Sequence, residues 1–210
     1  MATTPCGGWC PSFRESRWAE VFRTTITGLL AALIGLWIHN VALAEAVRWT
    51  VDPARSVIRL EVDALGMIQT GRFGDWSGYI VFDPAKPEAA RVNLAILAAS
   101  LDMGDSLVTA QAKSQGFLHV SDFPRIDVAL IGLERVGDDR YQARADVTCK
   151  GQTERVTFPV AVQVSGNEVQ IEGTASLDRE AFGIGTESLR GLIIGRIIKV
   201  DVDITARTRS

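Results

Sequence analysis

The chain has 210 residues, with 22 basic and 25 acidic side chains and a formal net charge of −3. A mildly acidic chain without a basic run argues against nucleic acid as a partner. Two of its three cysteines, Cys6 and Cys10, lie in the N-terminal export segment described below, and the one that remains cannot form an internal disulfide, so the stability of the fold has to come from an apolar core.

Residues 1–44 have the order and composition of an export signal and are left out of the fold. Three arginines precede an apolar run over residues 26–38, and small residues near Ala44 and Ala46 offer cleavage sites. The same run is almost long enough to span a bilayer, so an uncleaved anchor is the alternative. In either form the remaining residues, 45–210, are exported and are long enough for one domain.

Alternation of apolar and polar residues predicts β-strands along most of the exported domain. The pattern covers residues 47–52, 56–64, 71–83, 91–98, 125–132, 141–149, 156–164, 169–175 and 198–204. Turn signals separate most neighbouring strands, which favours antiparallel pairing. Because long strands with glycine bends suit a sheet that closes on itself, we expect an all-β antiparallel barrel of about eight strands.

The strand pattern stops between Ser100 and Pro124, where we expect a short helix or a lid-like loop. A connection of this length usually does more than link two strands, so we expect it to cover one end of the barrel. Phe117 and Phe123 carry enough apolar surface to close such a mouth. The alternative is a surface helix whose aromatic side chains pack into a separate small core.

The inward rows of the predicted strands define a candidate ligand-binding interior. Small residues at Ala143, Ala145 and Gly173 would leave room along its axis. The predicted site combines three inward rows with residues from the closing segments: Ile58, Leu60, Val62, Phe117, Tyr141, Ala143, Ala145, Val147, Phe158, Val160, Arg179 and Phe182.

Arg179 is the one charged residue of this predicted site. It lies between core positions at Leu177 and Phe182, so we expect a partly buried guanidinium that anchors the glycine-rich connection. A buried guanidinium must be paired, here with a distant carboxylate or with backbone carbonyl groups. The alternative role is contact with an anionic head group of a ligand.

The residues that usually carry enzyme chemistry are scarce. After the export segment the sequence has one histidine, His119, and one cysteine, Cys149, which is too few for a zinc or iron site or for a Ser-His-Asp arrangement. The pair Gly183 and Gly185 lacks the third glycine of a nucleotide-binding loop. We therefore expect no catalysis, no metal and no cofactor.

An ordered set of motifs resembles the YceI-like family of periplasmic polyisoprenoid-binding proteins. The stretch Trp49–Ser56 is similar to the family's opening W-x-[IVL]-D-P-x-H-S, with Arg55 in place of the common histidine. Later similarities, in chain order, lie at Gly71–Phe73, Trp76–Gly78, Phe82–Pro84, Ser100–Asp102, Phe117–Leu118, Phe123–Pro124, Asp146–Thr153 and, around Arg179, Phe182–Gly185. Further departures are Met103, Ala181 and Arg196.

This resemblance implies a lipocalin-like barrel in the periplasm that holds an isoprenoid-type lipid, such as a polyprenyl lipid or a quinone tail. It implies no catalysis, and it admits a homodimer. Two other classes of function stay open at the level of the sequence. One is an exported structural or stress-response β-protein with a filled core and no ligand, and the other is an enzyme.

Overall fold

The computed structural model describes residues 48–187, 191 and 193–208. The predicted export segment 1–44 and its cleavage sites near Ala44 and Ala46 lie outside the described residues.

The described part consists mainly of strands. They are β1 (Arg48–Val51), β2 (Val57–Ala64), β3 (Met67–Phe73), β4 (Trp76–Val81), β5 (Arg91–Leu97), β6 (Leu101–Asp102), β7 (Arg125–Arg135), β8 (Arg140–Cys149), β9 (Gln152–Ser165), β10 (Glu168–Asp178) and β11 (Ile194–Thr208). The helical elements are the 3₁₀ turns η2 (Pro53–Arg55), η3 (Pro87–Ala89) and η4 (Ala98–Ser100), and the α-helix α2 (Ser106–Lys113).

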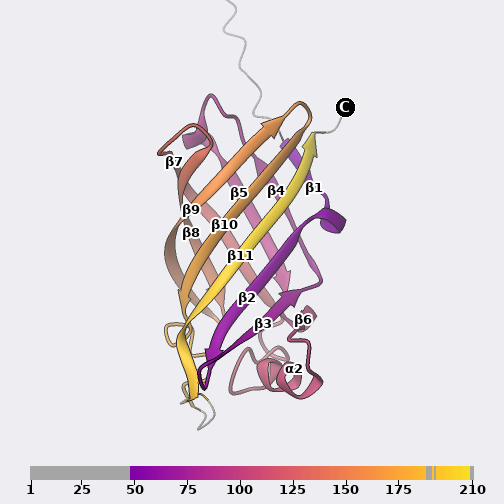
Figure 1. Ribbon diagram of the computed structural model, residues 1–210, viewed down its shortest axis with the longest axis vertical. Helices are drawn as coiled ribbons and strands as arrows, with labels where there is room; N and C mark the ends of the chain where they lie inside the picture. Colours follow the sequence, from indigo (N-terminus) through magenta and orange to yellow (C-terminus); the bar gives the residue numbers. More distant parts are fainter. Residues whose placement is uncertain (1–47, 188–190, 192, 209–210) are drawn as a thin grey trace, which may run out of the picture. The chain divides into compact units, whose positions relative to one another are not determined.

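These strands occupy eight positions around a closed barrel, because three pairs of short strands each form one interrupted strand (Figure 1). The three interrupted strands are β1 with β2, β4 with β3, and β5 with β6. β1 and β2 both pair with β11; β4 pairs with β1 and β3 pairs with β2; β5 then pairs with β4 and β6 pairs with β3. β7 to β11 complete the circuit, and every pairing is antiparallel. The predicted lipocalin-like barrel of about eight strands with a short helical excursion is confirmed.

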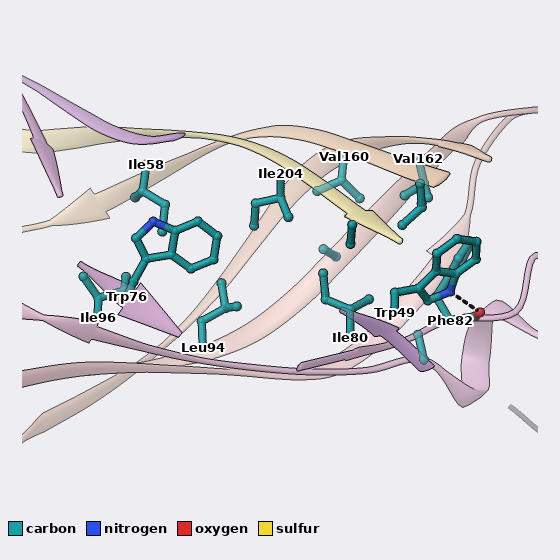
Figure 2. Packing of buried hydrophobic residues seen from close by; sticks show 14 of the residues in the cluster. Trp49, Ile58, Trp76, Ile80, Phe82, Leu94, Ile96, Val160, Val162 and Ile204 are labelled. Carbon is teal, nitrogen blue, oxygen red and sulfur yellow. Dashed lines mark hydrogen bonds between the residues drawn. The ribbon is translucent and has the colours of Figure 1, made fainter. Parts of the chain in front are cut away.

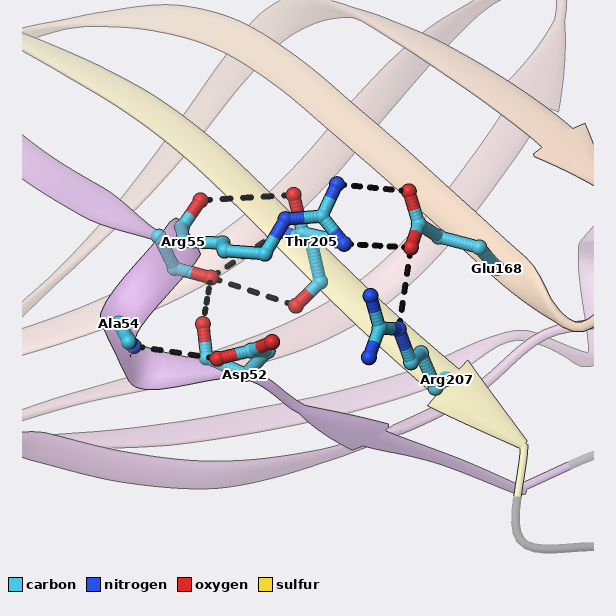
Figure 3. A network of polar contacts seen from close by, with 7 residues as sticks. Asp52, Ala54, Arg55, Glu168, Thr205 and Arg207 are labelled. Atoms are coloured by element: carbon cyan, nitrogen blue, oxygen red, sulfur yellow. Dashed lines mark hydrogen bonds and ion pairs between the residues drawn. The ribbon is translucent and has the colours of Figure 1, made fainter.

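The break between β1 and β2 is tied to the strand beside it (Figure 3). Pro53 cannot donate to the ladder, and the chain turns through η2. Ser56 Oγ donates to the carbonyl oxygen of Asp52 at 2.7 Å and accepts from the amide of Thr205 at 3.0 Å. Outside, the Arg55 guanidinium makes a two-pronged contact with the Glu168 carboxylate of β10. The interrupted strand therefore keeps its place against β10 and β11.

Inward side chains from both walls pack together along the barrel (Figure 2), and Trp49 and Phe82 lie at the end of this cluster where η3 connects β4 to β5. Trp49 is 3% exposed, and its indole Nε1 donates to the carbonyl oxygen of Phe82 at 3.0 Å. The Phe82 ring meets the Tyr141 ring edge-on, with centroids 5.9 Å apart. This end is closed by aromatic side chains on β1 and β8 and at the residue that follows β4.

The opposite end carries the excursion (Figure 1). Asp105 caps α2, because its Oδ1 accepts from the amides of Leu107 and Val108. None of the helix residues is buried, so the helix itself covers little of the barrel. The segment that follows the helix covers more of the barrel end, since Phe117 is only 6% exposed. Phe117 belongs to a second core cluster, formed with Val147, Cys149, Phe182 and Ile184. Part of the excursion thus covers this end, as predicted.

Phe123 does not take the place expected for it. It is half-buried and lies against Gly151, at the turn between β8 and β9, and its ring meets the His119 ring edge-on. His119 has a φ of 48°, and the Phe123 amide donates to the His119 carbonyl oxygen at 2.9 Å, so the chain turns between these two residues; Phe123 lines neither the cavity nor the cluster around Phe117. Phe117 therefore contributes to closing the mouth, whereas Phe123 does not.

Candidate ligand-binding cavity

The barrel interior contains a cavity of about 210 Å³. Nine strands, the connection between β4 and β5, the excursion and the connection after β10 contribute to its wall: Ile58, Leu60, Phe73, Ile80, Phe82, Ala90, Val92, Leu94, Ile96, Leu118, Ile126, Val128, Leu130, Leu133, Ala143, Ala145, Val147, Cys149, Val156, Phe158, Val160, Val162, Ile171, Ala175, Leu177, Phe182, Ile184, Ile198, Val200, Val202 and Ile204. All of these side chains are apolar. The lining residues of β9 run from Val156 to Val162, a length of about 20 Å at the usual strand rise. The cavity is therefore elongated and suits an apolar chain.

The structure brings eight of the twelve predicted site residues to this wall. They are Ile58, Leu60, Ala143, Ala145, Val147, Phe158, Val160 and Phe182. Each strand residue among them belongs to an alternating row. Because side chains on a strand alternate between its two faces, all apolar residues of one row face the interior.

The other four predicted residues lie around the cavity rather than on its wall. Tyr141 belongs to the aromatic cluster at the end near η3, and Phe117 packs in the second cluster at the α2 end. Val62 is only half-buried, because β6 covers β3 at Arg72 and Phe73 alone and leaves the outer part of the β2–β3 hairpin without a further described strand beside it. Arg179 is buried in the connection that follows β10.

Several wall residues were missed, although most carry the same signal. Leu94 on β5, Val128 on β7 and Val200 on β11 stand in alternating rows like those that were chosen. Leu118 and Ile184 are different, because they come from segments without periodicity. Only the folding of these two segments over the barrel end places their side chains against the cavity.

Not every small residue makes room inside. Ala143 and Ala145 line the cavity, as expected for residues that leave space. At Gly173, however, an added Cβ would lie 2.8 Å from Val160 Cγ1, so Val160 already fills the space that the missing side chain leaves. The expectation that Gly173 opens the interior is wrong, because the Val160 side chain of the neighbouring strand β9 packs directly onto it.

Two segments meet across the α2 end of the cavity. Phe117 of the excursion packs with Phe182 and Ile184 of the connection after β10. The Gly185 amide donates to the carbonyl oxygen of Gly116 at 2.8 Å and joins the two segments directly. Gly185 has a φ of 72°, and an added Cβ would lie 3.3 Å from the Phe117 ring, so both the backbone and the packing require glycine here.

Arg179 holds the connection in its folded form. It is 5% exposed, and its guanidinium donates to four backbone carbonyl groups, those of Ile184, Gly191, Ile194 and Gly195, at 2.8 to 3.0 Å. The Glu180 carboxylate lies 3.6 Å from its Nη2. Of the two kinds of partner expected for this arginine, the structure shows backbone carbonyls, and it buries the side chain more completely than predicted.

Cys149 and His119, the cysteine and the histidine of the described residues, both lie in structural surroundings. Cys149 lines the cavity, and burial raises the pKa of its thiol to about 11, which keeps it protonated at neutral pH. His119 Nε2 lies 3.4 Å from Asp122 Oδ1 in the excursion. Across the residues that the structure describes, no three histidine, cysteine, aspartate or glutamate side chains stand close enough together to bind a metal. The described residues also include no helix of the length and apolarity needed to cross a membrane.

Comparison with known proteins identifies relatives along most of the barrel. The family model of the YceI-like domain matches residues 49–206. UPF0312 proteins from Pseudomonas savastanoi pv. phaseolicola and from Shewanella baltica are 25% and 29% identical over 165 and 169 residues. Each of these alignments covers 74% of this chain and 86% of the relative.

Solved structures show the same fold. Burkholderia cenocepacia BcnA is 26% identical with a TM-score of 0.70, over 74% of this chain and 98% of BcnA. A polyisoprenoid binding domain from Saccharophagus degradans, implicated in plant cell wall breakdown, is 16% identical with a TM-score of 0.65, over 78% of this chain and 99% of that domain. Because the family model extends from the first strand of the barrel to the last, this chain belongs to the YceI-like family.

Proposed function

We propose that this protein is a periplasmic binding protein that holds an isoprenoid-type lipid, a polyprenyl lipid or a quinone tail, inside its barrel. The observation that carries the proposal is the continuous apolar wall of the cavity. An elongated cavity of this kind offers nothing to a sugar, a nucleotide or an ion, and it matches a flexible hydrocarbon chain. A carrier needs no catalytic group, so the proposal also assigns the protein no enzymatic reaction.

The size of the cavity favours an occupant over a filled structural core. At about 24 cal/mol per Å³, a void of 210 Å³ costs about 5 kcal/mol of folding free energy when it stays empty. That cost is similar to the whole stability of a small domain, which is about 5–15 kcal/mol. An apolar ligand recovers this free energy, because each buried methylene contributes about 0.8 kcal/mol.

Two further observations support the ligand class and the location. A solved domain with the same fold, from Saccharophagus degradans, is described as polyisoprenoid-binding. The export signal proposed for residues 1–44 would deliver the barrel to the periplasm. Cell fractionation tests the location, and the intact mass of the protein from the periplasmic fraction should place its N-terminus near Ala44 or Ala46.

Organic extraction of the purified protein, followed by mass spectrometry, tests the ligand. We expect an isoprenoid-type lipid in near-stoichiometric amount from the natural protein and much less from Ala145→Phe, which fills the cavity. An extract without such a lipid, together with a melting temperature that added isoprenoid leaves unchanged, would contradict the proposal and favour the exported structural β-protein. Size-exclusion chromatography with light scattering then decides whether the carrier is a homodimer.

A further inference from the structure

The cavity wall has no group that could recognise a polar head. The buried polar or charged residues in the described part of the chain are Ser56, Arg179 and Thr205, and none of them lines the cavity. Ser56 and Thr205 bond to each other and to the backbone at the break between β1 and β2. No buried side-chain nitrogen or oxygen among the described residues is left without a partner.

Arg179 is the buried cation nearest in sequence to the cavity wall, and most of its donors are already used. A guanidinium has five N–H donors, and four of them point to backbone carbonyl groups of the connection itself. A phosphate that accepted two or more N–H bonds from Arg179 would have to displace at least one of these carbonyl groups, and the side chain is only 5% exposed. The residue is therefore poorly placed to read an anionic head group.

The two ends of the cavity differ in what holds them shut. At the end near η3, Trp49, Phe82 and Tyr141 are each at most 3% exposed, and Trp49 stands on β1, which pairs with both β4 and β11. Opening this end would break the ladder that closes the barrel. At the α2 end the described part of the cover is formed by residues 114–118 and 179–185, none of which belongs to a strand, so these two segments can separate while the strands stay paired.

The contacts that join these two covering segments are few. The described backbone bond between them runs from the Gly185 amide to the Gly116 carbonyl, and the remaining contact is apolar packing of Phe117 on Phe182 and Ile184. Lys150 Nζ donates to the Gly183 carbonyl at 2.7 Å and ties the connection to the β8–β9 turn. A chain threaded between Phe117 and Phe182 would replace one apolar contact with another.

From these observations we propose that the cavity selects its ligand by the apolar chain alone, and that any head group stays outside the barrel, beyond Phe117 and Phe182 at the α2 end. This inference rests on the isoprenoid-binding function proposed above. It defines the ligand class more narrowly, as isoprenoids of matching chain, whatever head group they carry. An uncompensated polar group inside the wall would be strongly disfavoured, so the head group has to remain in water.

Ligands with one tetraprenyl chain and different head groups test the inference. The probes are geranylgeraniol, geranylgeranyl diphosphate and the corresponding hydrocarbon without a head group. Each competes with diphenylhexatriene, a fluorophore without polar atoms, for the delipidated protein. We expect the three dissociation constants to agree within about threefold, because the same chain is buried each time.

Deviations in either direction would overturn the inference. Binding of the alcohol or the diphosphate that is tighter than that of the hydrocarbon by about tenfold or more would reveal a head-group contact. Binding weaker by the same factor would show that the head group is drawn into the apolar barrel. If none of the three probes binds, the proposed isoprenoid-binding function itself fails, which is a different result from a head-group preference.

Two further measurements test whether Arg179 contacts the head group and at which end of the barrel the head group lies. Arg179→Met should change the affinity for all three probes by a common factor, whereas a selective loss of the diphosphate would contradict the inference. A nitroxide attached to the alcohol end of geranylgeraniol should broaden the amide signals of Gly116 and Gly185. Broadening of the Trp49 indole signal in their place would show that the head group leaves through the other end.

Discussion

Ala145 is the position at which filling the cavity gives the sharpest test. It is 1% exposed, it lines the wall, and it stands opposite Leu130 of β7 and Val156 of β9. Ala145→Phe adds a six-carbon ring that displaces about six ligand carbons, each contributing about 0.8 kcal/mol when buried. The loss is about 5 kcal/mol, so we expect the dissociation constant to rise by a factor of a few thousand.

The ligand-free protein should tolerate the same change. Burial of the ring contributes about 1.5–3 kcal/mol, while strain from overpacking costs about 1–3 kcal/mol. We therefore expect the free energy of unfolding of the ligand-free variant to stay within about 1–2 kcal/mol of the natural value. Circular dichroism and denaturant titration measure this term separately from binding.

Ala129→Phe is the matched control. Ala129 lies on β7 between two wall residues, Val128 and Leu130, so its side chain faces outward, and it borders a groove on the outer face of the barrel. The same substitution there should leave the affinity for geranylgeraniol unchanged. A folded Ala145→Phe variant that binds geranylgeraniol as tightly as the Ala129→Phe control would refute the assignment of this cavity as the binding site.

Three further predictions concern stability. Arg179→Met should lower the free energy of unfolding by at least about 3 kcal/mol, because it leaves buried carbonyl groups without donors. Arg196→Met, at a side chain that is 66% exposed, should change it by less than about 1 kcal/mol in the same denaturant titration. Equal effects of the two substitutions would argue against the anchoring role of Arg179. Leu65→Asn should stabilise the protein by about 0.5–1 kcal/mol, since Leu65 has a φ of 57° in a hairpin turn that suits asparagine, and a lowered melting temperature would contradict this reasoning. Hydrogen bonds from Arg55 and Arg207 lower the pKa of Glu168 from 4.5 to about 2, so the contribution of this carboxylate to stability is complete above pH 4.5 and disappears as the pH falls toward 2. The Glu168→Gln variant should therefore lose less stability than the natural protein over this pH interval. An acid dependence that is the same in both proteins would count against the ion pair.

The type of fold and the inward rows of the strands can be predicted from the pattern of residues alone. Alternation with a period of two identifies strands such as Tyr141–Cys149, and the same period tells which of their side chains face inward. This is local information, because a side chain's face follows from its parity along the strand. It suffices for Ala143, Ala145 and Val147, whose placement on the wall follows directly from the row they share.

Contacts between strands determine features that the position of a residue within its own strand does not predict. Val62 has the right parity, yet the partial cover of β3 by β6 leaves it half-buried and off the cavity wall. Gly173 has no side chain beyond hydrogen and still gives no room, because Val160 of the neighbouring strand β9 occupies the space. Both outcomes depend on the register and length of neighbouring strands, which the residues of one strand do not specify.

The covered end of the barrel shows the same division most clearly. The sequence predicts an excursion between Ser100 and Pro124 and a buried, paired Arg179, because a break in periodicity and a charge among core residues are visible locally. Only the tertiary structure shows that Phe117, and not Phe123, packs at the mouth, and that the partners of Arg179 are carbonyl groups of its own connection. Segments without a repeating pattern take their conformation from the surface on which they pack, so their side chains find their places only when the barrel beneath them is complete.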